Sequence, residues 1–333
     1  MLTAKYKNLT SKTYYNTFDN KYEDPDQGLD NGLDISVLGQ EFRYNGPASF
    51  GLEYEQLTAD STDFGKYKED RISTFLIKQF PLFGSNDKKI TAGLRVNDHS
   101  VFDKSYNPQL GFSFKHNQFD MALELNQSSN TPSFKQRYYE STYTKPNPGL
   151  GMEQATNVKL NMAYVASEDL ALSLSGFYSK IDGTIAYISN GDGTYSYQNI
   201  ATSTRRGIDM GANWQINPTL KLNASYLFLQ FTDDSTGLDL PFKPRHKAKI
   251  DLDAKLGKTL VTLTGNYVAD CYDDKQNTIV QSGRFTADAK VTYPLGNTKL
   301  LLSVDNLFDT EYETHVGYPA AGRTFMAGFR HQF

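Results

Sequence analysis

The sequence contains very little cysteine and tryptophan, with one of each in 333 residues. The lone Cys271 excludes an internal disulfide and a cluster of thiolate metal ligands. Long apolar runs are missing too, and a stretch such as residues 226–229 is far shorter than the roughly 20 apolar residues of a membrane-spanning helix. A helical membrane protein is therefore excluded.

Neither positive nor negative charge dominates the sequence. The chain has 34 Lys and Arg against 38 Asp and Glu, a net charge of −4, and no basic stripe. A nucleic-acid partner is therefore not expected. The first ten residues lack the basic start and the apolar segment of a secretion signal. Either such a signal has been removed from this sequence or the protein is not exported.

Aromatic residues, by contrast, are abundant. The chain has 22 Tyr and 21 Phe, although its mean hydropathy is only −0.55. This is more aromatic surface than a soluble protein of such polarity usually carries. The composition therefore indicates an extensive amphipathic structure.

Apolar and polar residues alternate along most of the chain. In residues 246–256, apolar Ala248, Ile250 and Leu252 alternate with charged Lys249 and Asp251. Successive side chains of an extended chain point to opposite faces, so this period predicts strands with one apolar and one polar face. About sixteen strands are predicted: two near the N-terminus, then 48–54, 67–79, 90–96, 110–114, 119–125, 158–164, 170–178, 208–214, 220–228, 247–255, 261–269, 285–293, 300–308, and the C-terminal stretch.

The links between these strands alternate in length. Short links rich in turn residues are expected at 45–47, 83–87, 116–118, 167–169, 217–219, 256–258 and 295–297. Long links are expected at 17–32, 56–68, 97–108, 127–155, 186–196, 232–243, 270–279 and 309–321. One end of the sheet should therefore carry tight turns and the other end long loops.

These features predict an all-β fold, a transmembrane antiparallel up-and-down β-barrel of about sixteen strands that occupies residues 1–333 as a single domain. Apolar side chains would face lipid and polar ones an aqueous lumen, with short periplasmic turns and long extracellular loops. Closure satisfies the backbone hydrogen bonds, which lipid requires. The strands of a soluble sandwich or propeller would also alternate apolar and polar residues, but such a fold would not place short links at one end and long links at the other so consistently.

The C-terminal stretch resembles the end of TonB-dependent outer-membrane receptors. The matching residues are Asn306, Leu307, Phe308, Asp309, Tyr312, Gly317, Tyr318, Pro319, Gly322, Arg323 and Phe333. An earlier segment is similar to the middle of the same barrel, through Pro132, Phe134, Tyr138, Asn147, Pro148, Leu150 and Glu153. The resemblance covers roughly the last two hundred residues.

The resemblance implies a location in the bacterial outer membrane, with outer-membrane lipid, lipopolysaccharide and the barrel assembly machinery as partners. It also implies that Phe329 and Phe333 contribute to the signal that this machinery reads. Family members have a 22-stranded barrel, a plug domain and a short segment that TonB grasps. Neither the plug nor that segment is found here, so TonB is expected as a partner only if a plug is supplied. The chain would be either the C-terminal part of a longer receptor or a reduced barrel.

The function that the resemblance implies is uptake of a scarce small-molecule chelate, such as a ferric siderophore, haem or cobalamin. The alternative is a passive, porin-like channel formed by a barrel without a plug. No enzyme is predicted, because the five His residues are far apart and no nucleophile and base have a suggestive spacing.

Two candidate sites follow from the long loops. Tyr312, His315 and Tyr318 lie close together in one loop and are candidates for binding the chelate, although single loop residues without such a role are common. Asp24, Asp26 and Asp30 form an acidic loop with glycines, and clustered carboxylates can hold Ca²⁺. The spacing does not match an EF-hand, and a solvated acidic loop is the simpler interpretation. No other cofactor is predicted.

Overall fold

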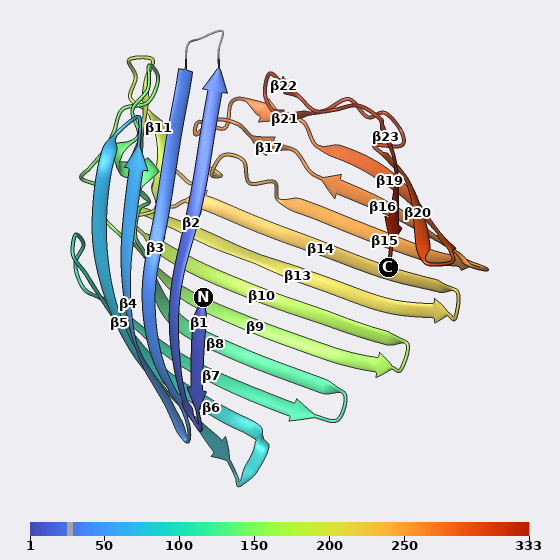
Figure 1. Ribbon diagram of the computed structural model, residues 1–333, viewed down its shortest axis with the longest axis horizontal. Helices are drawn as coiled ribbons and strands as arrows, with labels where there is room; N and C mark the ends of the chain where they lie inside the picture. The colour runs from blue at the N-terminus through green and yellow to red at the C-terminus, as the bar shows by residue number, and fades with distance from the viewer. Residues whose placement is uncertain (25–28, 333) are drawn as a thin grey trace. The chain divides into compact units, whose positions relative to one another are not determined.

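A computed structural model describes residues 1–24 and 29–332 (Figure 1). Within these residues it contains 23 strands and one short helix, α1 (Phe134–Tyr138). The long strands are β1 (Leu2–Tyr6), β2 (Leu9–Asp24), β3 (Leu29–Asn45), β4 (Ala48–Ser61), β5 (Gly65–Leu82), β6 (Ser85–His99), β7 (Ser105–His116), β8 (Phe119–Asn130), β9 (Glu153–Ser167), β10 (Leu170–Asp182), β13 (Thr202–Asn217), β14 (Leu220–Asp233), β15 (His246–Leu256), β16 (Thr259–Val268), β19 (Arg284–Leu295), β20 (Thr298–Asp305) and β23 (Thr324–His331).

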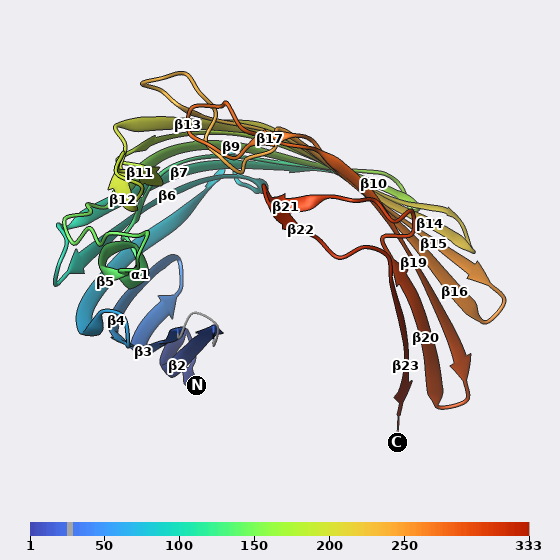
Figure 2. The ribbon, with the colours of Figure 1, turned by 90° about the horizontal axis from the view of Figure 1, so that it is seen from above.

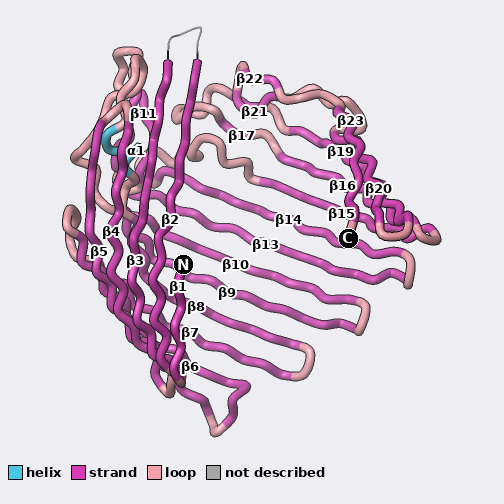
Figure 3. The backbone as a smooth tube through the Cα atoms, viewed as in Figure 1, coloured by secondary structure: helices cyan, strands magenta, loops and turns pink. Residues whose placement is uncertain are grey.

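Six short strands form three two-stranded sheets within loops. They are β11 (Ile185–Ser189) with β12 (Tyr195–Asn199), β17 (Cys271–Tyr272) with β18 (Val280–Gln281), and β21 (Glu313–His315) with β22 (Tyr318–Pro319). Figure 3 shows how strands dominate the chain. No helix in the part of the chain that the structure describes is long and apolar enough to cross a membrane.

The all-β, antiparallel, up-and-down character of the fold is confirmed, but the predicted count of about sixteen strands is too low. The short loop strands have two to five residues and therefore no alternation to detect. The N-terminal region has three strands rather than two, because Lys7 adopts a left-handed conformation (φ 51°) and turns the chain between β1 and β2. No glycine or proline marks this turn in the sequence.

The short links lie where they were predicted, between consecutive antiparallel strands. Left-handed residues make several of these turns, for example Asn117 (φ 51°), Gly257 (φ 60°) and Gly296 (φ 58°). Two of the predicted long links are wrong, because residues 17–24 and 29–32 continue β2 and β3, and only residues 62–64 separate β4 from β5. These strands keep their hydrogen-bonded partners beyond the strongly apolar segments that were recognised.

The described chain packs as two compact units. Unit 1 comprises Met1–Ser113, Glu124–Val158 and Ser179–Ser203, and unit 2 comprises Phe114–Leu123, Lys159–Tyr178 and Thr204–Phe333. In each unit, strands that follow one another in sequence pair antiparallel.

Unit 1 contains a sheet with two contrasting faces. Tyr14, Gly39, Glu55 and Arg71 are register partners on four successive strands, β2 to β5, and form one row across the same face of the sheet. On the opposite face, apolar side chains such as Leu76 remain 56% exposed. The predicted alternation of a polar and an apolar face is therefore present.

Unit 2 repeats this organisation. On its polar face, the Thr264 hydroxyl donates to the Asp251 carboxylate at 2.6 Å, and Thr262 donates to Asp253 at 2.6 Å. On its apolar face, Leu263 is 46% exposed. A sheet that leaves a band of apolar side chains uncovered is typical of a surface that faces lipid.

The buried apolar core among the described residues is small. It consists of Ala59, Phe134, Leu150, Ile200, Leu240 and Ala269. Five of these residues, all except Ala59, lie in α1 or in the long links rather than in the long strands. The long loops are therefore packed structures and not simple connections.

Candidate functional site

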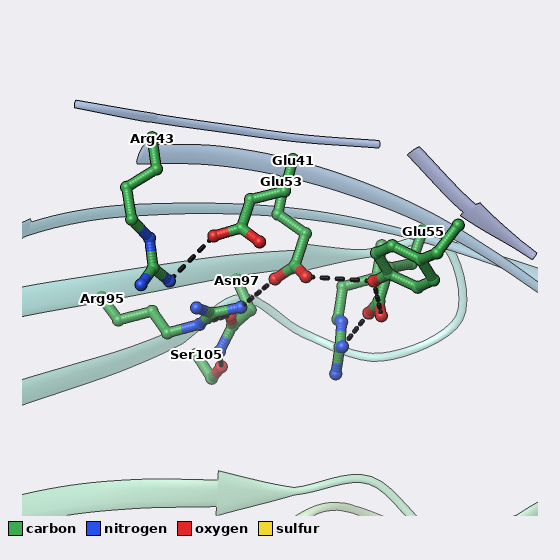
Figure 4. Close-up of polar contacts among 9 residues, drawn as sticks. Glu41, Arg43, Glu53, Glu55, Arg95, Asn97 and Ser105 are labelled. Atoms are coloured by element: carbon green, nitrogen blue, oxygen red, sulfur yellow. Dashed lines mark hydrogen bonds and ion pairs between the residues drawn. The ribbon is translucent and has the colours of Figure 1, made fainter. Parts of the chain in front are cut away.

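Charged side chains gather on the polar face of unit 1. They come from six neighbouring strands, β2 through β7, and Figure 4 shows them pointing toward one another. The charged cluster consists of Tyr14, Glu41, Arg43, Glu53, Glu55, Arg71, Arg95, Asn97 and Ser105. Ser73, whose side chain is completely buried, lies between Glu53 and Asn97 in the strand register.

Tyr14 crosses the cluster because residue 39 has no side chain. A Cβ atom at Gly39 would lie 2.1 Å from the Tyr14 ring. The ring occupies this space, and its hydroxyl donates to Glu55 at 2.6 Å and to Glu53 at 3.1 Å. One glycine thus allows a tyrosine on β2 to reach two carboxylates on β4.

Each glutamate of the cluster also has an arginine partner. Arg95 contacts Glu53 at 2.6 Å and donates through Nε to Asn97 at 2.9 Å. Arg71 pairs with Glu55, and Arg43 contacts Glu41 at 2.8 Å. Three negative and three positive groups therefore neutralise one another across the strands.

The arginine side chains of the cluster are more exposed to solvent than the glutamate side chains. The glutamate side chains are only 12–18% exposed, whereas Arg43, Arg71 and Arg95 are 47%, 35% and 36% exposed. The face consequently presents guanidinium groups, which bind carboxylates and other planar anionic groups in a bidentate manner. A cavity of about 320 Å³, lined by Arg43, Arg95, Phe75 and Gln109 among others, opens beside them.

The predicted ligand residues lie in a different place, in the loops of unit 2. His315 and Tyr318 face each other across the β21–β22 hairpin, with ring centroids 6.4 Å apart. The His315 ring also meets Phe242 edge-on at 4.8 Å. Tyr312 is instead in contact with Arg284, whose guanidinium lies 4.8 Å from its ring. The structure thus brings two of the three residues together, and a ligand role for them stays a prediction.

A cation site in the acidic loop also stays a prediction. Asp26 lies outside the described residues, and the side chains of Asp24 and Asp30, at the adjoining ends of β2 and β3, are not described either. Among the residues that the structure does describe, no group of three or more His, Cys, Asp or Glu could hold a metal ion. Any calcium site would depend on the undescribed side chains.

The motif residues at the end of β20 form a tight turn. Asn306 and Asp309 both adopt left-handed conformations, with φ of 54° and 56°. The Asn306 side chain donates to the Thr310 carbonyl and accepts from the Thr310 amide, both at 2.9 Å. Asn306 is only 6% exposed. Its role in the structure is therefore to fix where the strand ends and the long loop begins.

The same turn also fixes where the long loop returns. The Arg323 amide donates to the Asp309 carboxylate at 2.7 Å. Gly322 makes room for this contact, since a Cβ atom there would lie 2.8 Å from the carboxylate oxygen. At the tip, Gly317 has φ 85°, and its amide donates to Glu313 at 2.9 Å.

The remaining motif residues are exposed. Leu307 is 37% exposed, Phe308 64% and Tyr318 69%, and Pro319 lies in β22. Phe329, on the last strand, is 75% exposed, which suits contact with lipid or with another protein. Phe333 lies outside the described residues, so the assembly signal stays a prediction.

Sequence reasoning missed the charged cluster and one buried cation. The sequence does place Glu41, Glu53 and Arg95 at alternate positions with other polar residues, which indicates a polar face. Their pairing, however, depends on strand register, which the sequence does not show. Arg137 resembles any loop cation in the sequence, and yet its side chain is only 1% exposed. No local pattern marks this residue.

Comparison with known proteins gives a consistent result. The family model for the TonB-dependent receptor-like β-barrel matches residues 2–307. The vitamin B12 transporter BtuB of Vibrio cholerae is 27% identical over 253 residues, which cover 73% of this chain and 40% of the transporter. The chain therefore spans less than half the length of this curated relative.

Solved structures show the same fold. The ferric enterobactin receptor PfeA of Pseudomonas aeruginosa superposes with a TM-score of 0.72 at 18% identity, over 96% of this chain and 58% of the receptor. The copper transporter OprC gives a TM-score of 0.78 at 16% identity, over 96% of this chain and 62% of that protein. At such low identity these matches support the fold alone.

Proposed function

Because the chain belongs to the TonB-dependent receptor β-barrel family, whose members are Gram-negative outer-membrane proteins, we propose that it forms the transport wall of an uptake receptor for a scarce metal chelate. In this proposal the apolar face of each unit contacts lipid, and the polar face of each unit is in contact with water. The barrel assembly machinery, lipopolysaccharide and, through a plug, TonB would be its partners.

The observation that carries the proposal is the charged cluster of unit 1. Polar side chains that line a passage must tolerate water and still stay ordered, and paired charges across neighbouring strands meet both needs. The exposed guanidiniums of Arg43 and Arg95 beside a cavity of about 320 Å³ suit an anionic group of a chelate or of another protein surface.

We infer the chemical class of the cargo from the names of the similar proteins. Their names specify vitamin B12, ferric enterobactin and copper as the respective cargo. Vitamin B12 and ferric enterobactin each hold a metal in an organic ligand, and copper is itself a metal, so we propose a ferric siderophore, a cobalamin or a copper chelate as the cargo. Haem, which the sequence resemblance also implied, belongs to the same chemical group.

A passive channel is the second candidate. The water-exposed arginines on the polar face of unit 1 would also suit a pore that conducts ions and small solutes. The two candidates differ in whether a specific chelate occupies the passage.

Planar-bilayer recordings separate these candidates. The reconstituted chain is expected to conduct in discrete steps, and one of ferric enterobactin, cyanocobalamin or a copper chelate should block them at micromolar concentration. Substituting both Arg43 and Arg95 with Ala should weaken that block. Steps that respond to none of the three chelates would favour the passive channel, and failure to insert into lipid would contradict both candidates.

A further inference from the structure

The link between β8 and β9, residues 131–152, folds back against the polar face of unit 1. We call this segment the strap. Its short helix, α1, begins with a capping box in which the Gln136 amide donates to the Ser133 hydroxyl and the Ser133 amide donates to the Gln136 side chain. Figure 2 shows α1 next to β5. The capping box gives the strap a defined local structure.

Arg137 holds the strap to the sheet. Its side chain is 1% exposed and forms an ion pair with Glu69 on β5. The guanidinium carbon lies 4.9 Å from the ring centroid of Phe102, 5.2 Å from that of Phe134 and 4.8 Å from that of Tyr138. A planar cation between three aromatic rings and one carboxylate is a specific contact that lysine could not reproduce.

The face of the sheet under the strap is the polar one. Glu69 is two residues from Arg71 on β5, so both side chains lie on the same side as the charged cluster. Tyr67, one step further along that face, stacks on Tyr138 with centroids 3.7 Å apart and planes at 11°. The strap therefore lies on the side of the sheet that the proposed function assigns to the passage.

The far end of the strap is also fixed. Leu150 is 3% exposed. The Asn147 side chain donates to the Tyr197 carbonyl at 2.8 Å, and the Gly151 amide donates to the Asn199 side chain at 2.9 Å. The β11–β12 hairpin thus supports the strap at one end, while Arg137 fixes it at the other.

We propose that the strap is a latched constriction, in which the Arg137–Glu69 pair keeps residues 131–152 seated on the polar face and so narrows the passage. Its effect on passage rests on the proposed function. Without the Glu69 carboxylate the buried guanidinium of Arg137 would be an unpaired charge, which strongly destabilises the seated arrangement. The Nε of Arg137 is buried and has no hydrogen-bond partner in the structure, so the seated state is not maximally stabilised.

Limited trypsin digestion of the chain in lipid vesicles tests the latch directly. Glu69→Gln keeps Lys135 and Arg137 as cleavage sites but removes the carboxylate charge. We expect cleavage after Lys135 and Arg137 to accelerate at least about tenfold, the factor that corresponds to 1.4 kcal/mol. Asp192→Asn is the matched control, because it breaks the exposed pair of Asp192 with Lys145 on the same segment and should change nothing. Equal cleavage of the native chain and Glu69→Gln would overturn the latch.

Bilayer conductance tests the constriction. Glu69→Gln and, independently, Arg137→Lys should increase the conductance step, and Asp192→Asn should leave it unchanged. If the native chain is silent but Glu69→Gln conducts, the constriction is supported. Faster cleavage without any gain in conductance would overturn it. Because cleavage does not depend on transport, failure of the proposed function remains distinguishable from failure of the latch.

Discussion

Gly39 provides a sharp test of the charged cluster, because a single methyl group at this position would displace Tyr14. The added Cβ would lie 2.1 Å from the Tyr14 ring, far inside van der Waals contact. The ring would have to move, and its hydroxyl would lose the bonds to Glu55 at 2.6 Å and to Glu53 at 3.1 Å. Hydrogen bonds to charged groups contribute about 1.5–3 kcal/mol each. Since Tyr14 is half-buried, we expect Gly39→Ala to lower the free energy of unfolding by about 2–4 kcal/mol in total.

The assay is urea unfolding of the chain in lipid vesicles, followed by circular dichroism of the β-structure. Gly176→Ala is the matched control, because nothing lies within 4 Å of the Cβ added there. It should be neutral or slightly stabilising. In a Tyr14→Ala background, Gly39→Ala should have almost no further effect, within about 0.5 kcal/mol. A full loss of stability in that background, or none in the native chain, would refute the reasoning.

Three further predictions concern other parts of the fold. Leu263→Arg should destabilise the inserted chain by about 2–4 kcal/mol in the same unfolding assay, because residue 263 lies on the apolar face, which the proposal places against lipid; Thr286→Arg, on the polar face of β19, should have little effect. Asn306→Ala should lower the unfolding free energy by about 1–3 kcal/mol by removing both hydrogen bonds to Thr310. Burial raises the pKa of Tyr138. The contribution of its neutral hydroxyl to the stability of the strap is therefore present below about pH 10 and is lost as the pH rises above it. A fluorophore on the strap should report release of the strap at alkaline pH, and Tyr138→Phe should abolish this pH-dependent release.

Much of the fold could be predicted from the sequence because strand alternation is a local property. The apolar residues of 246–256 specify one face of β15 whatever its neighbours are. Strand ends were harder to predict. The sequence predicts a loop at residues 56–68, but Ala59 is completely buried and Ser61 nearly so, because the pairing of β4 with β5 continues to Gly65.

The candidate site was less predictable, since it depends on contacts between distant residues. The pair of Glu53 and Arg95 joins strands separated by about forty positions, and only the register of β4, β5 and β6 brings them together. Arg137 is buried because Glu69 and Phe102 meet it from elsewhere in the chain. His315 and Tyr318 could be found because a single hairpin holds both.

The most direct test of the two-faced sheet uses Trp214, the only tryptophan of the chain. Its side chain is 43% exposed on the apolar face of β13, in the same row as Met210 and Ile216. In vesicles, lipids with brominated acyl chains should strongly quench its fluorescence, and aqueous iodide should have little effect. Efficient quenching by iodide together with none by the brominated lipids would contradict a lipid-facing apolar surface, and with it the barrel on which the proposed function depends.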